Sequence, residues 1–282
     1  MANRRLGFSF LYFAPRIEAR HDRWFDALAR HGYCGAELPV HDATDVELKH
    51  MRTVTGATGL ATTAVGFATA ATDPISPDPA IRRAAVDHLG RLCEKAAILG
   101  ATVLAGPMHS AYGVFSEQPP TADERARCVE VLHAAGDRAA TFGVALAIEP
   151  LNRFECYFLN TAADCNAIVR AVAHPCVRAT LDTHHAHIEE RSIAAAIRAS
   201  ADTLGHVQLS ENHRGTIGTG QVDFARTLAA LDAIDYRGWL VVEAFSRQDP
   251  AFGSALRIWR DLDDGPESVI AAGVALVRNG RR

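Results

Sequence analysis

Short apolar or β-branched segments alternate with longer segments of helical period from one end of the chain to the other. Within Pro79–Leu99, for example, apolar residues recur at three- and four-residue steps, and no linker interrupts the alternation elsewhere. Strands are predicted at Leu6–Leu11, Gly35–Leu38, Ala61–Gly66, Thr102–Ala105, Val144–Glu149, Val177–Asp182, His206–Leu209 and Leu240–Glu243. Such repeated strand–helix units predict a closed parallel (β/α)8 TIM barrel in one domain over residues 1–282, with a doubly wound open sheet as the alternative fold.

Capping signals support the predicted helix boundaries. Thr121 precedes Glu124 by three residues, which predicts a capping box at the start of a helix over Ala122–Phe142. Gly100 follows Pro79–Leu99 directly and predicts the end of that helix.

Charge and composition indicate a protein that acts on a small molecule. The chain has 282 residues, with 29 Lys and Arg against 33 Asp and Glu, so the formal net charge is −4. A protein that binds nucleic acid or an anionic membrane surface needs a basic excess or a basic stripe, and the sequence shows neither. No segment approaches the roughly 18 consecutive apolar residues of a membrane-spanning helix.

The N-terminal apolar stretch and the cysteines both favour a cytoplasmic protein. The stretch from Leu6 to Ala14 is short, contains Ser9 and runs into Pro15 instead of a small-residue cleavage site, so we interpret it as a strand and not as a signal peptide. The six cysteines form no CxxC pair, which argues against a disulfide framework or a cysteine zinc site. We therefore expect a reducing, cytoplasmic location.

Polar residues close the last four predicted strands in register. Glu149, Asp182, Gln208 and Glu243 lie 33, 26 and 35 residues apart, each at or next to the end of a strand. A barrel of this length has about 35 residues per unit, so these residues fall on strands five to eight. Because the carboxyl ends of barrel strands open onto the catalytic face, the side chains should converge there. A single residue of this kind often only caps its strand, but four in register favour a functional site.

Three converging carboxylates repel one another and need protons or a cation to neutralise them. A divalent metal is the simplest solution, since carboxylate and amide oxygens suit hard cations such as Mg²⁺ and Mn²⁺. The sequence therefore predicts a metal site of Glu149, Asp182, Gln208 and Glu243, with room for two substrate oxygens.

Several motifs resemble one family of sugar-converting barrels. These are EPLNRFE (149–155), LDTHHAHIEE (181–190), HVQLSENHRGTIGTGQVDF (206–224), WLVVEAF (239–245) and GPMHSAYGVFS (106–116). Together they are similar to the D-tagatose 3-epimerase and L-ribulose 3-epimerase family of xylose isomerase-like barrels, over nearly the whole chain. The resemblance implies a TIM barrel that epimerises free ketoses at C3 with a divalent metal, usually Mn²⁺ or Co²⁺. It also implies a homo-oligomer, a dimer or a tetramer.

The same resemblance implies roles for individual residues. Glu149 and Glu243 would bind the metal and shuttle the proton, and Asp182 would be a metal ligand. The substrate-binding residues implied or favoured are Glu155, His185, Arg214 and His109.

Position 208 departs from the family pattern. The family usually has a metal-binding histidine there, two residues after the first histidine of the strand, and this chain has Gln208 after His206. Positions two apart in a strand share a face, so His206 should lie one layer deeper. An amide oxygen can still ligate a hard cation, and relatives that include dehydroshikimate dehydratases resemble this arrangement. The alternative function is therefore a metal-dependent lyase or dehydratase on a keto-sugar or cyclic keto-acid.

The chemistry of epimerisation explains why two carboxylates are needed. A C–H next to a ketone is a very weak acid, so its removal requires a Lewis acid on the oxygens and a base at the proton. Glu149 and Glu243, on opposite faces of the sugar, would let one remove the proton and the other return it to an enediolate from the far side. A dehydratase would instead use the second group to protonate a leaving hydroxyl.

Other candidate residues carry weaker signals. His184, His185 and His187 lie in one predicted loop without zinc-protease spacing, and only His185 is favoured as a substrate ligand. Arg214 is interpreted as a substrate clamp, with a surface ion pair as the alternative. His109 is expected to contact the substrate, to line the pocket or to support its wall.

Glu37 ends the second predicted strand and is assigned either to the pocket or to a structural hydrogen bond. Gly215–Gly220 lacks the surroundings of a phosphate-binding loop and is interpreted as a loop that approaches the substrate. Phe67 and Phe245 belong to an aromatic set expected in the core and pocket wall.

Two further function classes of this barrel are less consistent with the sequence. DNA-repair endonucleases share this barrel type, but they resemble histidine-rich multi-zinc sites and need a positive DNA-binding face, which a net charge of −4 argues against. A non-enzymatic sugar-binding barrel would be favoured if a ligand position were apolar, and none of the four is.

Overall fold

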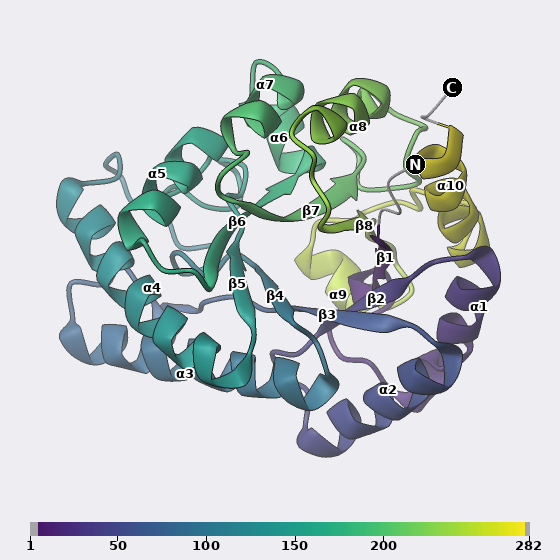
Figure 1. The fold of residues 1–282 in the computed structure, drawn as a ribbon, viewed down its shortest axis with the longest axis horizontal. Coiled ribbons are helices and arrows are strands. Elements are labelled where there is room, and N and C mark those ends of the chain that lie inside the picture. Colours follow the sequence, from purple (N-terminus) through teal and green to yellow (C-terminus); the bar gives the residue numbers. More distant parts are fainter. Residues whose placement is uncertain (1–4, 280–282) are drawn as a thin grey trace.

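The computed structural model describes residues 5–279 and has eight parallel strands that pair in chain order and close into a barrel (Figure 1). The strands are β1 (Arg5–Ser9), β2 (Gly35–Pro39), β3 (Ala61–Val65), β4 (Val103–Gly106), β5 (Ala145–Ile148), β6 (Val177–Asp182), β7 (Leu204–Ser210) and β8 (Trp239–Glu243). The predicted (β/α)8 barrel is confirmed, and the open-sheet alternative is wrong because β1 pairs with both β2 and β8. The ends of the predicted domain, 1–4 and 280–282, lie outside the described residues.

Helices form a ring around the barrel (Figure 1). They are α1 (Arg23–His31), α2 (Asp45–Thr58), α3 (Pro79–Leu99), α4 (Ala122–Phe142), α5 (Ala162–Val172), α6 (Thr183–Glu189), α7 (Ile193–Ala199), α8 (Phe224–Ala233), α9 (Pro250–Ala255) and α10 (Pro266–Asn279), with 3-10 helices η1 (Phe10–Tyr12), η2 (Ala19–His21) and η3 (Ala70–Thr72). In this view α9 lies inside the ring, next to the strands. None of the described helices is both long and apolar enough to cross a membrane.

Local capping determines where the two longest helices begin and end. The Thr121 hydroxyl accepts a hydrogen bond from the backbone N–H of Glu124, whose carboxylate accepts one from the N–H of Thr121, so the predicted capping box is confirmed. Gly100 ends α3 with φ at 88°, a left-handed conformation that glycine adopts without a steric penalty.

The first strand is shorter than predicted. β1 ends at Ser9, and the chain turns at once into η1, whereas the sequence predicted a strand through Leu11. Phe10 leaves the strand direction because its ring stacks on Phe25 of α1, with centroids 4.3 Å apart. This contact with a residue 15 positions away has no counterpart in the local pattern.

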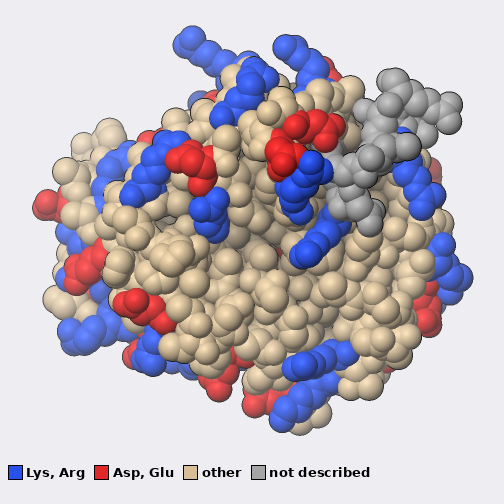
Figure 2. All heavy atoms as spheres, in the orientation of Figure 1, with Lys and Arg blue, Asp and Glu red and all other residues tan. Residues whose placement is uncertain are grey.

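Charged side chains are distributed without a strongly one-signed face in the view of Figure 2. Lys and Arg are interspersed with Asp and Glu around the edge of that face, and uncharged residues fill its middle. The interior of the barrel, by contrast, contains buried polar residues toward the carboxyl ends of the strands, including Glu37, His206 and Gln208, each with no exposed surface.

Candidate active site

The ends of strands β5 to β8 bring the four predicted ligand residues to one region. Glu149 follows β5 directly, Asp182 ends β6, Gln208 lies in β7 and Glu243 ends β8. Asp182 is paired in register with Gln208. All four are buried, with no side chain exposed by more than a few per cent. Parallel strand register thus produces the convergence that their spacing predicted.

Arg214 lies between two of these carboxylates. Its Nη1 donates to Asp182 Oδ2 at 2.7 Å and to Glu243 Oε2 at 2.6 Å. The guanidinium also lies 4.7 Å from the ring of Phe245, whose backbone N–H donates to the Arg214 carbonyl. The alternative of a surface ion pair is wrong, because Arg214 is buried. Arg214 therefore supplies the positive charge that partners the carboxylates of Asp182 and Glu243.

Burial and mutual repulsion shift the ionisation of the carboxylates. Burial raises the pKa of Glu149. Burial also raises the pKa of Glu243 well above its ordinary value; the positive charge of Arg214 acts against this rise, and the negative charges of Asp182 and Glu149 add to it. For Asp182 burial acts in the same direction, but the positive charge of Arg214 and the nearby histidines bring its pKa below the ordinary value. One guanidinium is therefore not enough to keep all three buried carboxyl groups ionised, and the raised pKa values of Glu149 and Glu243 favour their protonated forms.

His185 and Glu155 are held together by Asn152. The backbone N–H of Asn152 donates to His185 Nδ1 at 3.0 Å, and its side-chain amide donates to Glu155 Oε1 at 2.8 Å. The other ring nitrogen, Nε2, lies 2.9 Å from Arg214 Nη2 and 3.4 Å from Glu149 Oε1, so the imidazole also joins Arg214 to the carboxylate of Glu149. The expectation that His185 lies in a loop was wrong, since Thr183–Glu189 forms α6. Asn152 was missed, and only its place three residues before the acidic end of EPLNRFE hinted at it.

A second polar cluster lies deeper in the barrel and ends at Gln208. Its Nε2 donates to Glu243 Oε1 at 3.1 Å and to Glu37 Oε1 at 3.0 Å. Glu37 also accepts from the Thr63 hydroxyl and lies 2.8 Å from His206 Nε2. Gln208 and His206 thus face the same carboxylate, as their spacing predicted. The Gln208 amide oxygen is buried and has no hydrogen-bond partner among the residues that the structure describes.

Two sequence candidates do not line the cavity described below. His109 is fully buried, its Nδ1 pairs with the Ser110 hydroxyl, and its ring lies against the backbone of Glu149, so of the positions expected for it the supporting one fits. The glycine loop after β7 does not line that cavity either. The Glu211 carboxylate accepts the backbone N–H groups of Gly218, Gln221 and Val222, so these amides serve the loop's own fold.

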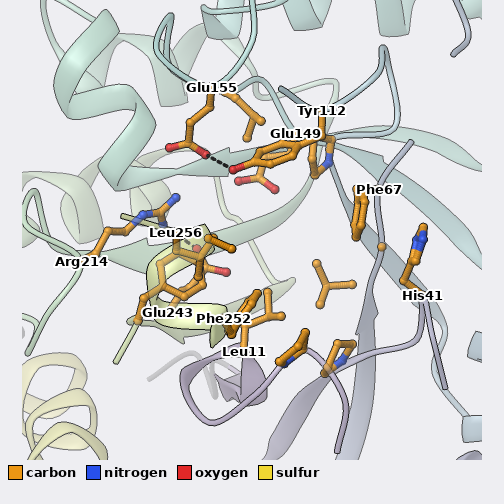
Figure 3. A pocket seen from close by; sticks show the side chains of 18 of the residues that line it. Leu11, His41, Phe67, Tyr112, Glu149, Glu155, Arg214, Glu243, Phe252 and Leu256 are labelled. Carbon is orange, nitrogen blue, oxygen red and sulfur yellow. Dashed lines mark hydrogen bonds and ion pairs between the residues drawn. The ribbon is translucent and has the colours of Figure 1, made fainter. Parts of the chain in front are cut away.

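A cavity of about 300 Å³ opens beside the carboxylates (Figure 3). Of the predicted site residues, five line it: Glu149, Glu155, His185, Arg214 and Glu243. Asp182 and Gln208 lie behind this wall. Sequence reasoning missed Tyr112, whose hydroxyl contacts Glu155 at 3.5 Å, and Phe252 of α9, whose ring packs edge-on against Phe245. The pocket-wall role expected for Phe67 and Phe245 agrees with the lining.

Known proteins share both the sequence and the fold of this chain. Residues 25–274 match the xylose isomerase-like TIM barrel family. The chain is 35% identical to the L-ribulose 3-epimerase of Methylomonas sp. over 236 residues, which are 83% of this chain and 82% of that protein. It is 32% identical to the D-psicose 3-epimerase of Agrobacterium fabrum over 266 residues, 93% and 92% of the two chains. The crystal structure of a D-allulose 3-epimerase from Methylomonas sp. in complex with D-allulose is similar with a TM-score of 0.90, at 30% identity, over 99% of this chain and 98% of that one.

Proposed function

The chain belongs to the xylose isomerase-like TIM barrel family, and from this premise we propose that it is a ketose 3-epimerase, an enzyme that inverts C3 of a free ketose. Its relatives at 32–35% identity are L-ribulose and D-psicose 3-epimerases. The observation that carries the proposal is that Glu149 and Glu243, two buried carboxyl groups on different strands, line one cavity of sugar size. Two proton-transfer groups at one cavity are what inversion at carbon requires.

The residues around this cavity fit a divalent cation. Ligand atoms of Glu149, Asp182 and His185 lie within 4.8 Å of one another, and Glu243 shares Arg214 with Asp182. The buried amide oxygen of Gln208 is a hard donor atom that no group within residues 5–279 satisfies. We assign Glu149, Asp182, Gln208 and Glu243 as the metal-holding residues. Mn²⁺ is the favoured ion, and Mg²⁺ or Co²⁺ also suit oxygen donors.

When bound, a divalent cation would polarise the carbonyl and hydroxyl oxygens of the ketose and so acidify the C3 hydrogen. One glutamate, as the carboxylate, removes that hydrogen as a proton and leaves an enediolate. The other, as the carboxylic acid, returns a proton to the opposite face of C3. Glu155, His185 and Arg214 are placed to hold the oxygens next to the reacting carbon. Figure 3 shows that each glutamate has such a residue near it: Glu149 lies beside Glu155 and Tyr112, and Glu243 lies beside Arg214.

The proposal is tested by running the reaction of D-fructose or D-psicose in D₂O with the Mn²⁺-loaded protein and locating the label by NMR. Exchange through two glutamates places deuterium at C3 of the epimer formed. A product that carries no deuterium would indicate a hydride shift between substrate carbons and would contradict the two-glutamate mechanism. A product that has lost water would support the dehydratase alternative.

A further inference from the structure

The cavity next to the carboxylates has two unlike sides. Polar groups gather at the reacting side, where Glu149, Glu155, His185, Arg214 and Glu243 lie. The rest of the wall is almost entirely apolar, and Figure 3 shows Leu11, Phe252 and Phe67 across the cavity from Glu155 and Arg214. A wall of this kind is unusual for a sugar, because each hydroxyl that leaves water needs a new hydrogen-bond partner.

The apolar wall is built from four separate parts of the fold. Leu11 comes from η1, Val65 from the end of β3, Phe67 from the segment after β3, and Phe252 from α9 with Leu256 just beyond it. Phe252 packs on Phe245, which fixes α9 against the barrel end. The wall is therefore part of the packed structure and does not depend on one side chain.

Polar groups elsewhere in the lining are few, and His41 Nδ1, which has no hydrogen-bond partner among the described residues, is buried away from solvent. Among the described residues that line the cavity, none is Lys, Ser, Thr, Asn or Gln. The Tyr112 hydroxyl is directed to Glu155 on the reacting side. The His41 ring lies flat on Phe67, with centroids 4.0 Å apart, and Asp42 has a side chain that is 69% exposed. Within residues 5–279, Arg214 is the one Lys or Arg side chain that lines the cavity, and Asp182 and Glu243 already bind it.

The apolar wall faces the part of the substrate that does not react. With C2 and C3 at the carboxylates, the C4–C6 arm of a ketohexose must occupy the remaining space. A hydroxyl at its end would face carbon atoms, whereas a methyl group there would gain apolar contact. A terminal phosphate would find no cationic side chain among the described residues of this wall.

We propose that this site is selective for ketoses with an apolar distal end, that is 6-deoxyketohexoses, over the corresponding ketohexoses and ketose phosphates. The inference rests on the proposed 3-epimerase function and adds a substrate class to it. A hydrophobic wall discriminates against an added hydroxyl only moderately, so the preference in kcat/KM should be about 10- to 100-fold.

The test compares D-psicose with 6-deoxy-D-psicose as substrates of the Mn²⁺-loaded protein, and D-fructose 6-phosphate serves as a third probe. We expect kcat/KM to be at least about 10-fold higher for the deoxy sugar than for D-psicose, and at least about 100-fold lower for the phosphate than for D-psicose. The variant Leu11→Asn, of nearly the same size, adds hydrogen-bonding groups to the apolar wall and should reduce the deoxy preference several-fold. Leu276→Asn, on α10 and away from the cavity, is the matched control and should keep it.

The decisive measurement is how the ratio of kcat/KM for 6-deoxy-D-psicose to kcat/KM for D-psicose changes from the parent protein to the Leu11→Asn variant. Ring-opening equilibria differ between the two sugars, but they are properties of the sugars and cancel when the same ratio is compared across proteins. If Leu11→Asn does not fold, Leu256→Asn takes its place. A parent protein that epimerises both sugars at C3 but favours D-psicose, or a preference that wall variants leave unchanged, would overturn this inference alone. Failure to epimerise either sugar would overturn the proposed function and this inference with it.

Discussion

Arg214 Nη1 lies 2.6 Å from Glu243 Oε2, and the same nitrogen lies 2.7 Å from Asp182 Oδ2. One guanidinium nitrogen thus joins the ends of β6 and β8. Because the pair is buried, removing either partner leaves a charge without compensation, which costs far more than the loss of an exposed ion pair.

Substitution of Arg214 should therefore destabilise the metal-free protein. We expect Arg214→Met to lower the free energy of unfolding by about 3–5 kcal/mol in the presence of a chelator. Arg170→Met is the control, because Arg170 pairs with Asp202 on the surface and its loss should cost about 1 kcal/mol or less. Mn²⁺ should raise the Tm of Arg214→Met more than that of the parent, since the cation supplies the missing positive charge. Equal destabilisation by both variants in urea titrations would contradict the role assigned to Arg214.

The amide at position 208 should set the metal preference. An amide oxygen is a harder donor than an imidazole nitrogen, so Gln208→His should tighten Mn²⁺ and Co²⁺ relative to Mg²⁺. Gln208→Ala should weaken all three ions. Isothermal titration of the chelator-treated proteins measures both effects without reference to activity. Metal affinity that survives Gln208→Ala unaltered would remove Gln208 from the ligand set. A Gln208→His protein that binds metal but is inactive on every ketose would favour the lyase alternative.

The two glutamates should be separable by the epimer on which each acts. Glu149→Gln and Glu243→Gln should each lower turnover by about 10²–10⁴-fold, since each removes one proton-transfer group. In D₂O each variant should exchange the C3 proton of a different epimer without inverting it, because the remaining glutamate reaches one face only. A variant that still interconverts both epimers at the parent rate would exclude its glutamate from proton transfer.

Variants of the neighbouring residues should behave differently from the two glutamate variants. Glu155→Gln should raise KM and retain inversion, and Asp182→Ala should weaken metal binding more than Glu149→Gln or Glu243→Gln.

His109 should make the fold sensitive to mild acid. Burial lowers the pKa of His109 to about 3, whereas an unfolded histidine has a pKa near 6.5. The unfolded state therefore binds more protons below pH 6.5, and stability falls as the pH is lowered from there. Between pH 7 and pH 5 this one group should cost about 2 kcal/mol. In the metal-free His109→Gln protein, the free energy of unfolding should fall less between pH 7 and pH 5 than it does in the parent, by this amount. Denaturant unfolding of both proteins at both pH values measures the difference. Identical declines would show that His109 does not contribute.

Local sequence patterns were sufficient to predict the barrel and the ends of α3 and α4, since both depend on signals that repeat within a few residues. Helical period and capping are local, so α3 and α4 begin and end at the predicted residues. The spacing of Glu149, Asp182 and Glu243 was informative because parallel strands start together, and equal units bring their ends to one face.

Contacts between residues far apart in the sequence could not be predicted from local patterns and are seen only in the folded structure. The pairing of Gln208 with Glu37 spans 171 positions, and no periodic signal connects residues so far apart. Leu11 and Phe252 share the cavity wall only because barrel closure brings β1 beside β8. His109 illustrates the limit of strand position, because its place after β4 allowed a contact with substrate, a place in the pocket wall or a position behind that wall, and the packing of the interior buries it. Strand position determines which end of the barrel a side chain occupies, and the packing of non-adjacent segments determines what it touches.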